Sequence, residues 1–213
     1  CSSNQDMQTF IDTYMSEYLV GFDFDIEAGQ TQDDIKQLVN TLVYVQKKYP
    51  KLRISFTLQS LADSTSTATS LNATGVNVVN AAKAAGLDAY YNLMVMDYGS
   101  TNATNCVIKG GACDMGQSAI QAAKNLSTKY GVPYSRIELT PMIGDNDTWD
   151  ENFTLADVAT VSNFVNSNGL AGVHYWSFDR DTPCSSKINY ASSTCNIVNS
   201  KPLDFTNEFA KYF

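Results

Sequence analysis

The chain has 213 residues, with 14 basic and 22 acidic side chains and a formal net charge of −8. Its length and its 44% hydrophobic residues predict a single globular domain over residues 1–213, with a sizeable core. The acidic balance argues against nucleic acid or an anionic membrane surface as the main partner, because both are polyanions. No apolar run approaches the roughly 18 residues of a membrane-spanning helix.

Stretches typical of strands and of helices alternate along the chain. In chain order, we expect a helix over 5–19, a strand over 18–27, a helix over 31–50, a strand over 52–59, a helix over 75–86, a strand over 89–99, a helix over 116–131, a strand over 136–144, a helix over 153–169, a strand over 169–179 and a helix over 204–212. Each predicted strand is a nearly continuous apolar run, as expected for a parallel sheet that is buried on both faces.

This alternation predicts an α/β fold with a parallel sheet. A Rossmann sheet is one possible arrangement, but no GxGxxG motif follows any of the predicted strands. Long or polar loops follow the strands instead, and barrel enzymes concentrate their chemistry in such loops. A (β/α)8 TIM barrel therefore fits the sequence better.

The cysteines and glycosylation sequons indicate an exported protein. Cys106 and Cys113 flank one loop-like stretch and Cys184 and Cys195 flank another, so each pair could form a local disulfide. Free buried thiols are the alternative, and the sequence leaves the pairing open. The local pairing leaves Cys1 over, which we interpret as a sign that a segment precedes it. Five Asn-X-Ser/Thr sequons begin at Asn72, Asn102, Asn125, Asn146 and Asn152. Glycosylation at Asn72 is one option.

Three carboxylates follow one another along the first predicted strand. Residues two apart in a strand point to the same side, so Asp23, Asp25 and Glu27 share one face, with Phe24 and Ile26 on the other. If the row is buried, mutual repulsion should make at least one of these groups bind a proton above its usual pKa. Such an arrangement is typical of a general acid held protonated near neutral pH.

Other readings of this row fit less well. The apolar residues of the same segment disfavour a solvated edge strand. An EF-hand loop needs glycine sixth and glutamate twelfth, but counting from Asp23 these positions hold Ala28 and Asp34. The single histidine, His174, leaves few nitrogen ligands for a metal cluster. We therefore predict catalysis, without a metal or another cofactor.

Four motifs resemble glycoside hydrolase family 18, the chitinases and their relatives. GFDFDIE (21–27) looks like the DGxDxDxE signature of that family, and segments 92–99, 138–147 and 172–184 resemble the later strands of its bacterial-type members. The resemblance implies a (β/α)8 barrel of which this chain covers about strands four to eight. It also implies that the first three strands come from an N-terminal segment that completes the barrel, since five strands cannot close one.

The resemblance also implies roles for the carboxylates. Glu27 corresponds to the acid that protonates the glycosidic oxygen, and the nucleophile is the substrate's own N-acetyl carbonyl oxygen. Asp25 corresponds to the aspartate that orients the acetamido N–H. Asp23 corresponds to the inner carboxylate, and the three groups would titrate as a coupled set.

Further residues are implied to contact the sugar. Asp97 corresponds to an aspartate at the cleavage site. Met96 stands where the family's tyrosine is expected, and Tyr98 follows Asp97 instead, so Tyr98 is either the phenol that contacts the N-acetyl group or a packed aromatic. Trp176 corresponds to the floor beneath the sugar, with a core tryptophan as the alternative. Met142 lies where a groove wall would form.

The resemblance predicts a secreted, extracellular chitinase that acts with retention on chitin or chito-oligosaccharides, with endo cleavage favoured. An endo-β-N-acetylglucosaminidase acting on glycoprotein glycans is the rival with the same chemistry. A chitinase-like lectin without turnover is the rival from another class. Such lectins commonly lose the acid, whereas Glu27 is present here.

Overall fold

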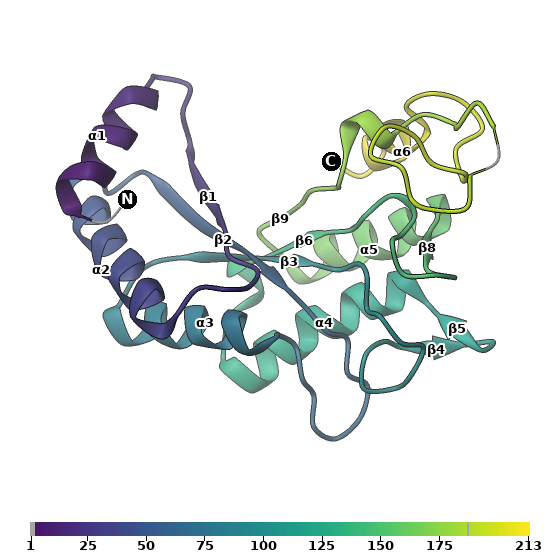
Figure 1. The fold of residues 1–213 in the computed structure, drawn as a ribbon, viewed down its shortest axis with the longest axis horizontal. Helices are drawn as coiled ribbons and strands as arrows, with labels where there is room; N and C mark the ends of the chain where they lie inside the picture. Colours follow the sequence, from purple (N-terminus) through teal and green to yellow (C-terminus); the bar gives the residue numbers. More distant parts are fainter. Residues whose placement is uncertain (1–2, 187) are drawn as a thin grey trace. The chain divides into compact units, whose positions relative to one another are not determined.

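The computed structural model describes residues 3–186 and 188–213 (Figure 1). The chain divides into two compact units, of which the first runs to Gln59 and includes Leu71–Asn92, and the second comprises Ser60–Ser70 and Leu93–Phe213. Cys1, the cysteine that the local pairing leaves over, lies outside the described residues.

The first unit holds three helices and the strands between them. In chain order these elements are α1 (Asn4–Tyr14), β1 (Gly21–Asp25), α2 (Gln32–Lys48), β2 (Arg53–Gln59), α3 (Ala73–Ala85) and the first residues of β3 (Tyr90–Met94). Helix α2 packs against both α1 and α3 (Figure 1).

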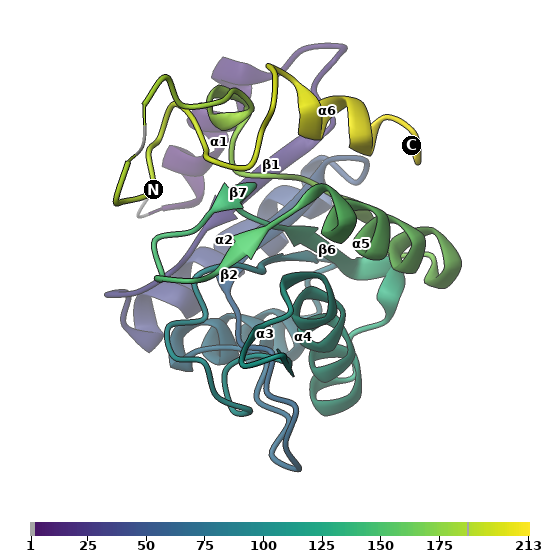
Figure 2. The same cartoon turned by 90° about the vertical axis from the view of Figure 1, so that its right-hand side faces the viewer.

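The second unit begins with the end of β3 and continues the alternation. Its elements are β4 (Ile108–Lys109), β5 (Ala112–Cys113), α4 (Met115–Tyr130), β6 (Ile137–Thr140), β7 (Gly144–Asp145), β8 (Asn152–Phe153), α5 (Leu155–Asn168), β9 (Gly172–Val173) and α6 (Asp204–Phe209). Single 3-10 turns cover Tyr134–Arg136 and Phe178–Arg180. Helix α5 packs against α4 and α6 (Figure 2).

Five strands form one sheet in the order β1-β2-β3-β6-β9. Strand β1 pairs with β2 in parallel, and β6 pairs with β9 in parallel. The predicted α/β fold with a parallel sheet is therefore confirmed. Among the described residues the sheet is open, with β1 and β9 at its edges, and it does not close a barrel.

Helix α2 shows how the local sequence produces an element. Thr31 caps its N-terminus, and a capping box joins this residue to Asp34, whose carboxylate oxygen lies 3.0 Å from the Thr31 amide nitrogen. Lys47 and Lys48 occupy the last turn, where positive charge suits the helix dipole. The apolar positions recur about every 3.6 residues, so one face is buried, and it comprises Ile35, Val39, Leu42 and Val45.

Two expectations about the strands were wrong in part. The prediction that every strand is buried on both faces fails at β1, because β1 is an edge strand and none of its residues is fully buried. The strand predicted over 89–99 ends at Met94. One more ladder bond forms, from the Val95 amide to the Thr140 carbonyl (3.0 Å), and then Asp97 adopts a left-handed backbone (φ 48°) that no extended strand allows.

Several predicted elements are shorter in the structure. The helix predicted over 5–19 ends at Tyr14, and the one predicted over 204–212 ends at Phe209. The strand predicted over 169–179 is reduced to Gly172–Val173 and an isolated bridge between Met142 and Trp176.

Both local disulfides form, Cys106–Cys113 and Cys184–Cys195. The first bond closes the hairpin β4–β5, which the sequence analysis missed. Its turn is Gly110-Gly111, with φ of 63° and 88°. Two consecutive positive φ values are the geometry of a type I′ hairpin turn, so the glycine pair was a signal for this hairpin.

Candidate active site

The carboxylate row lies along β1 and its continuation in the first unit. Asp23 and Asp25 are both exposed and belong to β1. The Ile26 amide donates to the Thr57 carbonyl (3.0 Å), so the chain stays paired with β2 for one residue beyond the strand. Glu27 follows, and its carboxyl shares a hydrogen bond with that of Asp25.

The pKa of Asp25 is raised above its ordinary value. The residue as a whole is exposed, but partial burial of its carboxyl group is the largest cause, and the charges of Glu27 and Asp23 add to it. A hydrogen bond between two carboxyl groups also requires a proton on one of them, which favours the protonated form further. The row can thus hold a proton between two neighbouring carboxyls.

Asp23 is held by the polar face of β2, which the sequence analysis missed. The Ser55 hydroxyl donates to Oδ1 of Asp23 and the Thr57 hydroxyl donates to Oδ2, both at 2.6 Å. The Asn92 amide donates in turn to the Thr57 hydroxyl (2.9 Å). In the strand register Asp23 faces Ser55 and Asp25 faces Thr57. The alternation of polar residues in an otherwise apolar strand was the signal for this match.

Asn72 fixes the backbone of Glu27. Its Nδ2 donates to the Glu27 carbonyl (2.8 Å) and to the side-chain oxygen of Gln59 (2.7 Å). Its Oδ1 accepts from the Gly75 amide (2.8 Å), which makes Asn72 the N-cap of α3. One side chain therefore joins the segment of the candidate acid to the end of β2 and the start of α3.

A second group of predicted residues follows β3 in the second unit. Met96 is 8% exposed, whereas Asp97 is exposed. The Thr148 amide donates to the Asp97 carboxylate (3.0 Å), and the Asn146 side-chain oxygen accepts from the Asp97 amide (3.3 Å). Partial burial of its carboxyl raises the pKa of Asp97, and the charge of Asp147 acts in the same direction.

Tyr98 is 2% exposed, and its hydroxyl has no hydrogen-bond partner among the described residues. Burial raises the pKa of this phenol well above its ordinary value. The Tyr98 ring is thus packed in the interior of the second unit.

Glu151, a residue absent from the sequence predictions, lies beneath this turn. It is 1% exposed, and its carboxylate accepts from the Tyr98 amide (3.0 Å) and from the Gly99 amide. Its other oxygen lies 3.9 Å from the sulfur of Cys113, which has no proton to donate because it belongs to a disulfide. Burial raises the pKa of Glu151 to about 7, and the charge of Asp97 contributes.

Trp176 and Met142 lie side by side through an isolated parallel bridge. The Trp176 amide donates to the Pro141 carbonyl, and the Ile143 amide donates to the Trp176 carbonyl, both at 2.9 Å. Met142 is 2% exposed, whereas Trp176 is 41% exposed and offers an aromatic surface. The structure therefore brings together two residues that the sequence predicted to contact substrate.

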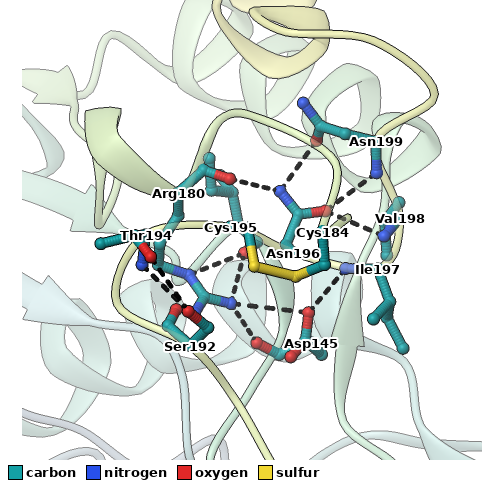
Figure 3. The surroundings of a disulfide bond; sticks show 11 residues. Asp145, Arg180, Cys184, Ser192, Thr194, Cys195, Asn196, Ile197, Val198 and Asn199 are labelled. Atoms are coloured by element: carbon teal, nitrogen blue, oxygen red, sulfur yellow. Dashed lines mark hydrogen bonds and ion pairs between the residues drawn. A yellow bond between two sulfur atoms is a disulfide. The ribbon is translucent and has the colours of Figure 1, made fainter. Parts of the chain in front are cut away.

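The support behind Trp176 is a buried arginine, Arg180, which the sequence analysis did not single out. Its guanidinium lies 5.2 Å from the centre of the Trp176 ring. It donates to the carbonyls of Ile143 (3.1 Å), Asp145 and Ser192, and it forms an ion pair with the Asp145 carboxylate (3.7 Å). Figure 3 shows the contacts of Asp145 and Ser192 converging on Arg180 from separate segments.

The same figure shows the Cys184–Cys195 disulfide close to Arg180, and Ser192 lies in the loop that this bond closes. Asn196, next to this bond, donates to the Arg180 carbonyl (2.6 Å; Figure 3). Gly144 has a left-handed backbone, and a side chain at this position would collide with Asn196. Asn196 therefore packs closely against Gly144 on one side and holds the Arg180 backbone on the other.

Other features are separate from these two groups. Within residues 3–186 and 188–213, no group of three or more histidine, cysteine, aspartate or glutamate residues is arranged to hold a metal ion. A hollow of about 540 Å³ lies between α2 and α3, and none of the predicted site residues lines it. None of the described helices is long and apolar enough to cross a membrane.

Comparison with known proteins shows that the chain is similar to chitinases. No protein-family model matches it. It is 30% identical over 199 residues to a probable bifunctional chitinase/lysozyme of Escherichia coli, a match that covers 86% of this chain and 21% of that protein. It is 29% identical over 194 residues to endochitinase 11 of Metarhizium anisopliae, covering 84% and 36% respectively.

Solved structures give the same relationship. The catalytic domain of a hyperthermophilic chitinase from Pyrococcus furiosus is 27% identical, with a TM-score of 0.75, and the match covers 100% of this chain and 67% of that one. Catalytic-site mutants of active domain 2 of the Pyrococcus furiosus chitinase, in complex with chito-oligosaccharides, are 25% identical, again with a TM-score of 0.75, covering 100% and 66%. The chain thus spans a minor part of its curated relatives and about two thirds of the solved domains.

Proposed function

We propose that this chain carries the catalytic centre of a family 18 chitinase that hydrolyses β-1,4-N-acetylglucosamine linkages with retention, cleaving within the polymer. The observation that carries the proposal is the row Asp23, Asp25 and Glu27, in which one carboxyl has a raised pKa and a hydrogen bond to the next. The similarity to chitinase catalytic domains supports the same conclusion.

In the proposed reaction, Glu27 protonates the glycosidic oxygen while the substrate's N-acetyl oxygen attacks the anomeric carbon. Asp25 turns towards the acetamido N–H, orients it and stabilises the positive charge of the ring that forms. Asp23 is the inner carboxylate beside Asp25, and its bonds to Ser55 and Thr57 hold it in position. Glu27 then acts as the base that activates water.

The second group of residues binds the sugar in this proposal. Asp97 is the polar contact, because it is exposed and is fixed by Thr148. Trp176 offers an aromatic platform for a pyranose face. The other three residues, Met142, Met96 and Tyr98, are buried. Met142 therefore supports the Trp176 platform, and Met96 and Tyr98 support the segment that carries Asp97.

The five strands are proposed to be strands four to eight of a (β/α)8 barrel. The open edges at β1 and β9 support this assignment, because an open edge leaves backbone groups unpaired. The solved chitinase domains also extend beyond the region that this chain matches. A further N-terminal segment would complete the barrel.

The proposed substrate is chitin or a chito-oligosaccharide, and the proposed location is extracellular. A chito-oligosaccharide complex of a structural neighbour supports the substrate class. The two disulfides support the location, because such bonds persist in oxidising compartments.

The test compares hydrolysis of a short chito-oligosaccharide by the wild type, by Glu27→Gln and by the control Glu17→Gln, whose residue is exposed. The proposal expects the first change to lower kcat by orders of magnitude and the control to have no effect. Equal rates for wild type and Glu27→Gln would refute it. Binding without cleavage by the wild type would indicate the lectin alternative, and cleavage of a glycoprotein glycan alone would indicate an endo-β-N-acetylglucosaminidase.

A further inference from the structure

The structure divides the five Asn-X-Ser/Thr sequons into two classes. An N-glycan is bulky and needs an asparagine whose Nδ2 faces solvent. Three of the five asparagines use Nδ2 for hydrogen bonds inside the protein, and two lie exposed without such bonds among the described residues. This difference determines which sequons a folded chain can carry in glycosylated form.

Asn125 and Asn146 are interior residues. Asn125 lies on α4, is 3% exposed, and donates to the Asp63 carbonyl (2.8 Å). Asn146 is 5% exposed and donates to the Met142 carbonyl (3.0 Å) and the Gly144 carbonyl (3.2 Å). A sugar on either amide would have to displace packed neighbours and would leave buried carbonyls without donors, which is unfavourable.

Asn72, the residue for which glycosylation was an option, is also unsuited. Its Nδ2 already serves two acceptors, the Glu27 carbonyl and the Gln59 side chain, while its Oδ1 caps α3. A glycosidic bond replaces one of the two Nδ2 protons, so at least one of these bonds would be lost. The sugar would also stand between segments that this side chain joins.

Asn102 and Asn152 differ in both respects. Asn102 is exposed in the loop before Cys106, and its Oδ1 accepts from the Thr104 amide (3.0 Å) and the Thr104 hydroxyl. Asn152 is exposed in β8, where the backbone pairs with Asp145 of β7. Within the described part of the chain, neither Nδ2 has an acceptor, so a glycan at these positions breaks no hydrogen bond.

We propose that Asn102 and Asn152 are the N-glycosylation sites of this protein, and that the other three sequons stay unmodified in the folded chain. The modification transfers an oligosaccharide from a lipid-linked pyrophosphate donor. The asparagine Nδ2 forms a bond with C1 of the first sugar, the bond from C1 to the pyrophosphate oxygen breaks, and Nδ2 loses one proton to a base of the transferase. The two disulfides are consistent with passage through a compartment where this transfer takes place.

The test is secretion of the chain from a yeast, followed by deglycosylation and peptide mass spectrometry of the folded, secreted protein. Enzymatic removal of the glycan leaves aspartate in place of each occupied asparagine. We expect this signature at Asn102 and Asn152 alone, and we expect the double variant N102Q/N152Q to carry no N-glycan. Occupancy of Asn72, Asn125 or Asn146 in protein that unfolds cooperatively, or empty Asn102 and Asn152, would overturn the proposal.

A matched pair of variants keeps the proposal testable if the double variant is not secreted. Thr104→Ala and Thr148→Ala each destroy one sequon and leave its asparagine in place. The first is expected to lower the mass of the secreted protein by one glycan, and the second is expected to leave the mass unchanged apart from the substitution itself. The reverse pattern would contradict the assignment.

Discussion

Replacing Glu151 with glutamine should change how stability depends on pH. Burial raises the pKa of Glu151 from 4.5 to about 7, and the charges of Asp97 and Asp150 act in the same direction, while the amides of Tyr98 and Gly99 oppose them. An acid whose pKa is raised by folding takes up a proton on folding at pH values between the two pKa values. Its contribution to stability is therefore fully present below about pH 4.5 and declines as the pH rises to about 7.

The size of this effect follows from the two pKa values. The difference between 4.5 and about 7 corresponds to about 3 kcal/mol at 1.36 kcal/mol for each pH unit. Asp97 titrates in the same cluster and solvent screens part of the charge, so about 2 kcal/mol is the expected net loss between pH 4.5 and pH 8. Glutamine is neutral throughout and lacks this loss. In a domain of this size, about 2 kcal/mol corresponds to about 4–8 °C in Tm.

The assay is thermal unfolding of the wild type, Glu151→Gln and the control Glu17→Gln at intervals from pH 4 to pH 8. At pH 4 the Glu151 carboxyl is protonated and offers the two amide donors one carbonyl oxygen, as glutamine does, so Glu151→Gln is expected to be about as stable as the wild type there. Between pH 4 and pH 8 the variant should gain about 2 kcal/mol relative to the wild type, and the control should run parallel to the wild type. Parallel curves for wild type and Glu151→Gln would refute the reasoning.

Three further predictions concern Asn72, Trp176 and the disulfide of the β4–β5 hairpin. Asn72→Ala removes a helix cap and the bond to the Glu27 carbonyl, so we expect a loss of about 2 kcal/mol in chemical denaturation and a kcat lowered at least about tenfold. Trp176→Ala is expected to raise KM for chito-oligosaccharides about tenfold with a smaller change in kcat. Replacing Cys106 and Cys113 with serine opens a short loop, and we expect a loss of about 2 kcal/mol in the free energy of unfolding.

The carboxylate row could be predicted from the sequence because it depends on one local rule. Side chains alternate along an extended strand whatever the rest of the fold does, so Asp23 and Asp25 must share a face. Side chains alternate in the same way along the partner strand β2, so Ser55 and Thr57 share a face of that strand and lie opposite Asp23 and Asp25. The disulfides were predictable for a related reason, since each pair closes a short local loop.

The ends of the strands were less predictable, because they depend on hydrogen bonds to residues outside the sheet. Nothing in the apolar run over 89–99 indicates that pairing stops after Val95. Burial was also misjudged at β1, since an edge position depends on the order of strands and not on the composition of one strand. The same apolar pattern serves a central strand such as β2 and an edge strand such as β1.

The residues that support the second group could not be found by spacing. Glu151 accepts from the amide of Tyr98 across 53 positions of sequence, and Arg180 reaches the Ile143 carbonyl across 37. Glu151 directly follows Asp150, and Arg180 stands between Asp179 and Asp181, so in sequence both look like ordinary surface charges of a polar loop. Only tertiary structure shows that both are almost completely buried.

The turn at Asp97 shows why these supports bear on function. A left-handed backbone costs a residue other than glycine about 1–2 kcal/mol, so Asp97 keeps this conformation only if its surroundings favour it. Asn146, Thr148 and Glu151 supply three hydrogen bonds to the turn, and all three come from the segment that follows β7. The position of the Asp97 carboxylate therefore depends on that segment, so changes there should affect sugar binding even where no side chain contacts the sugar.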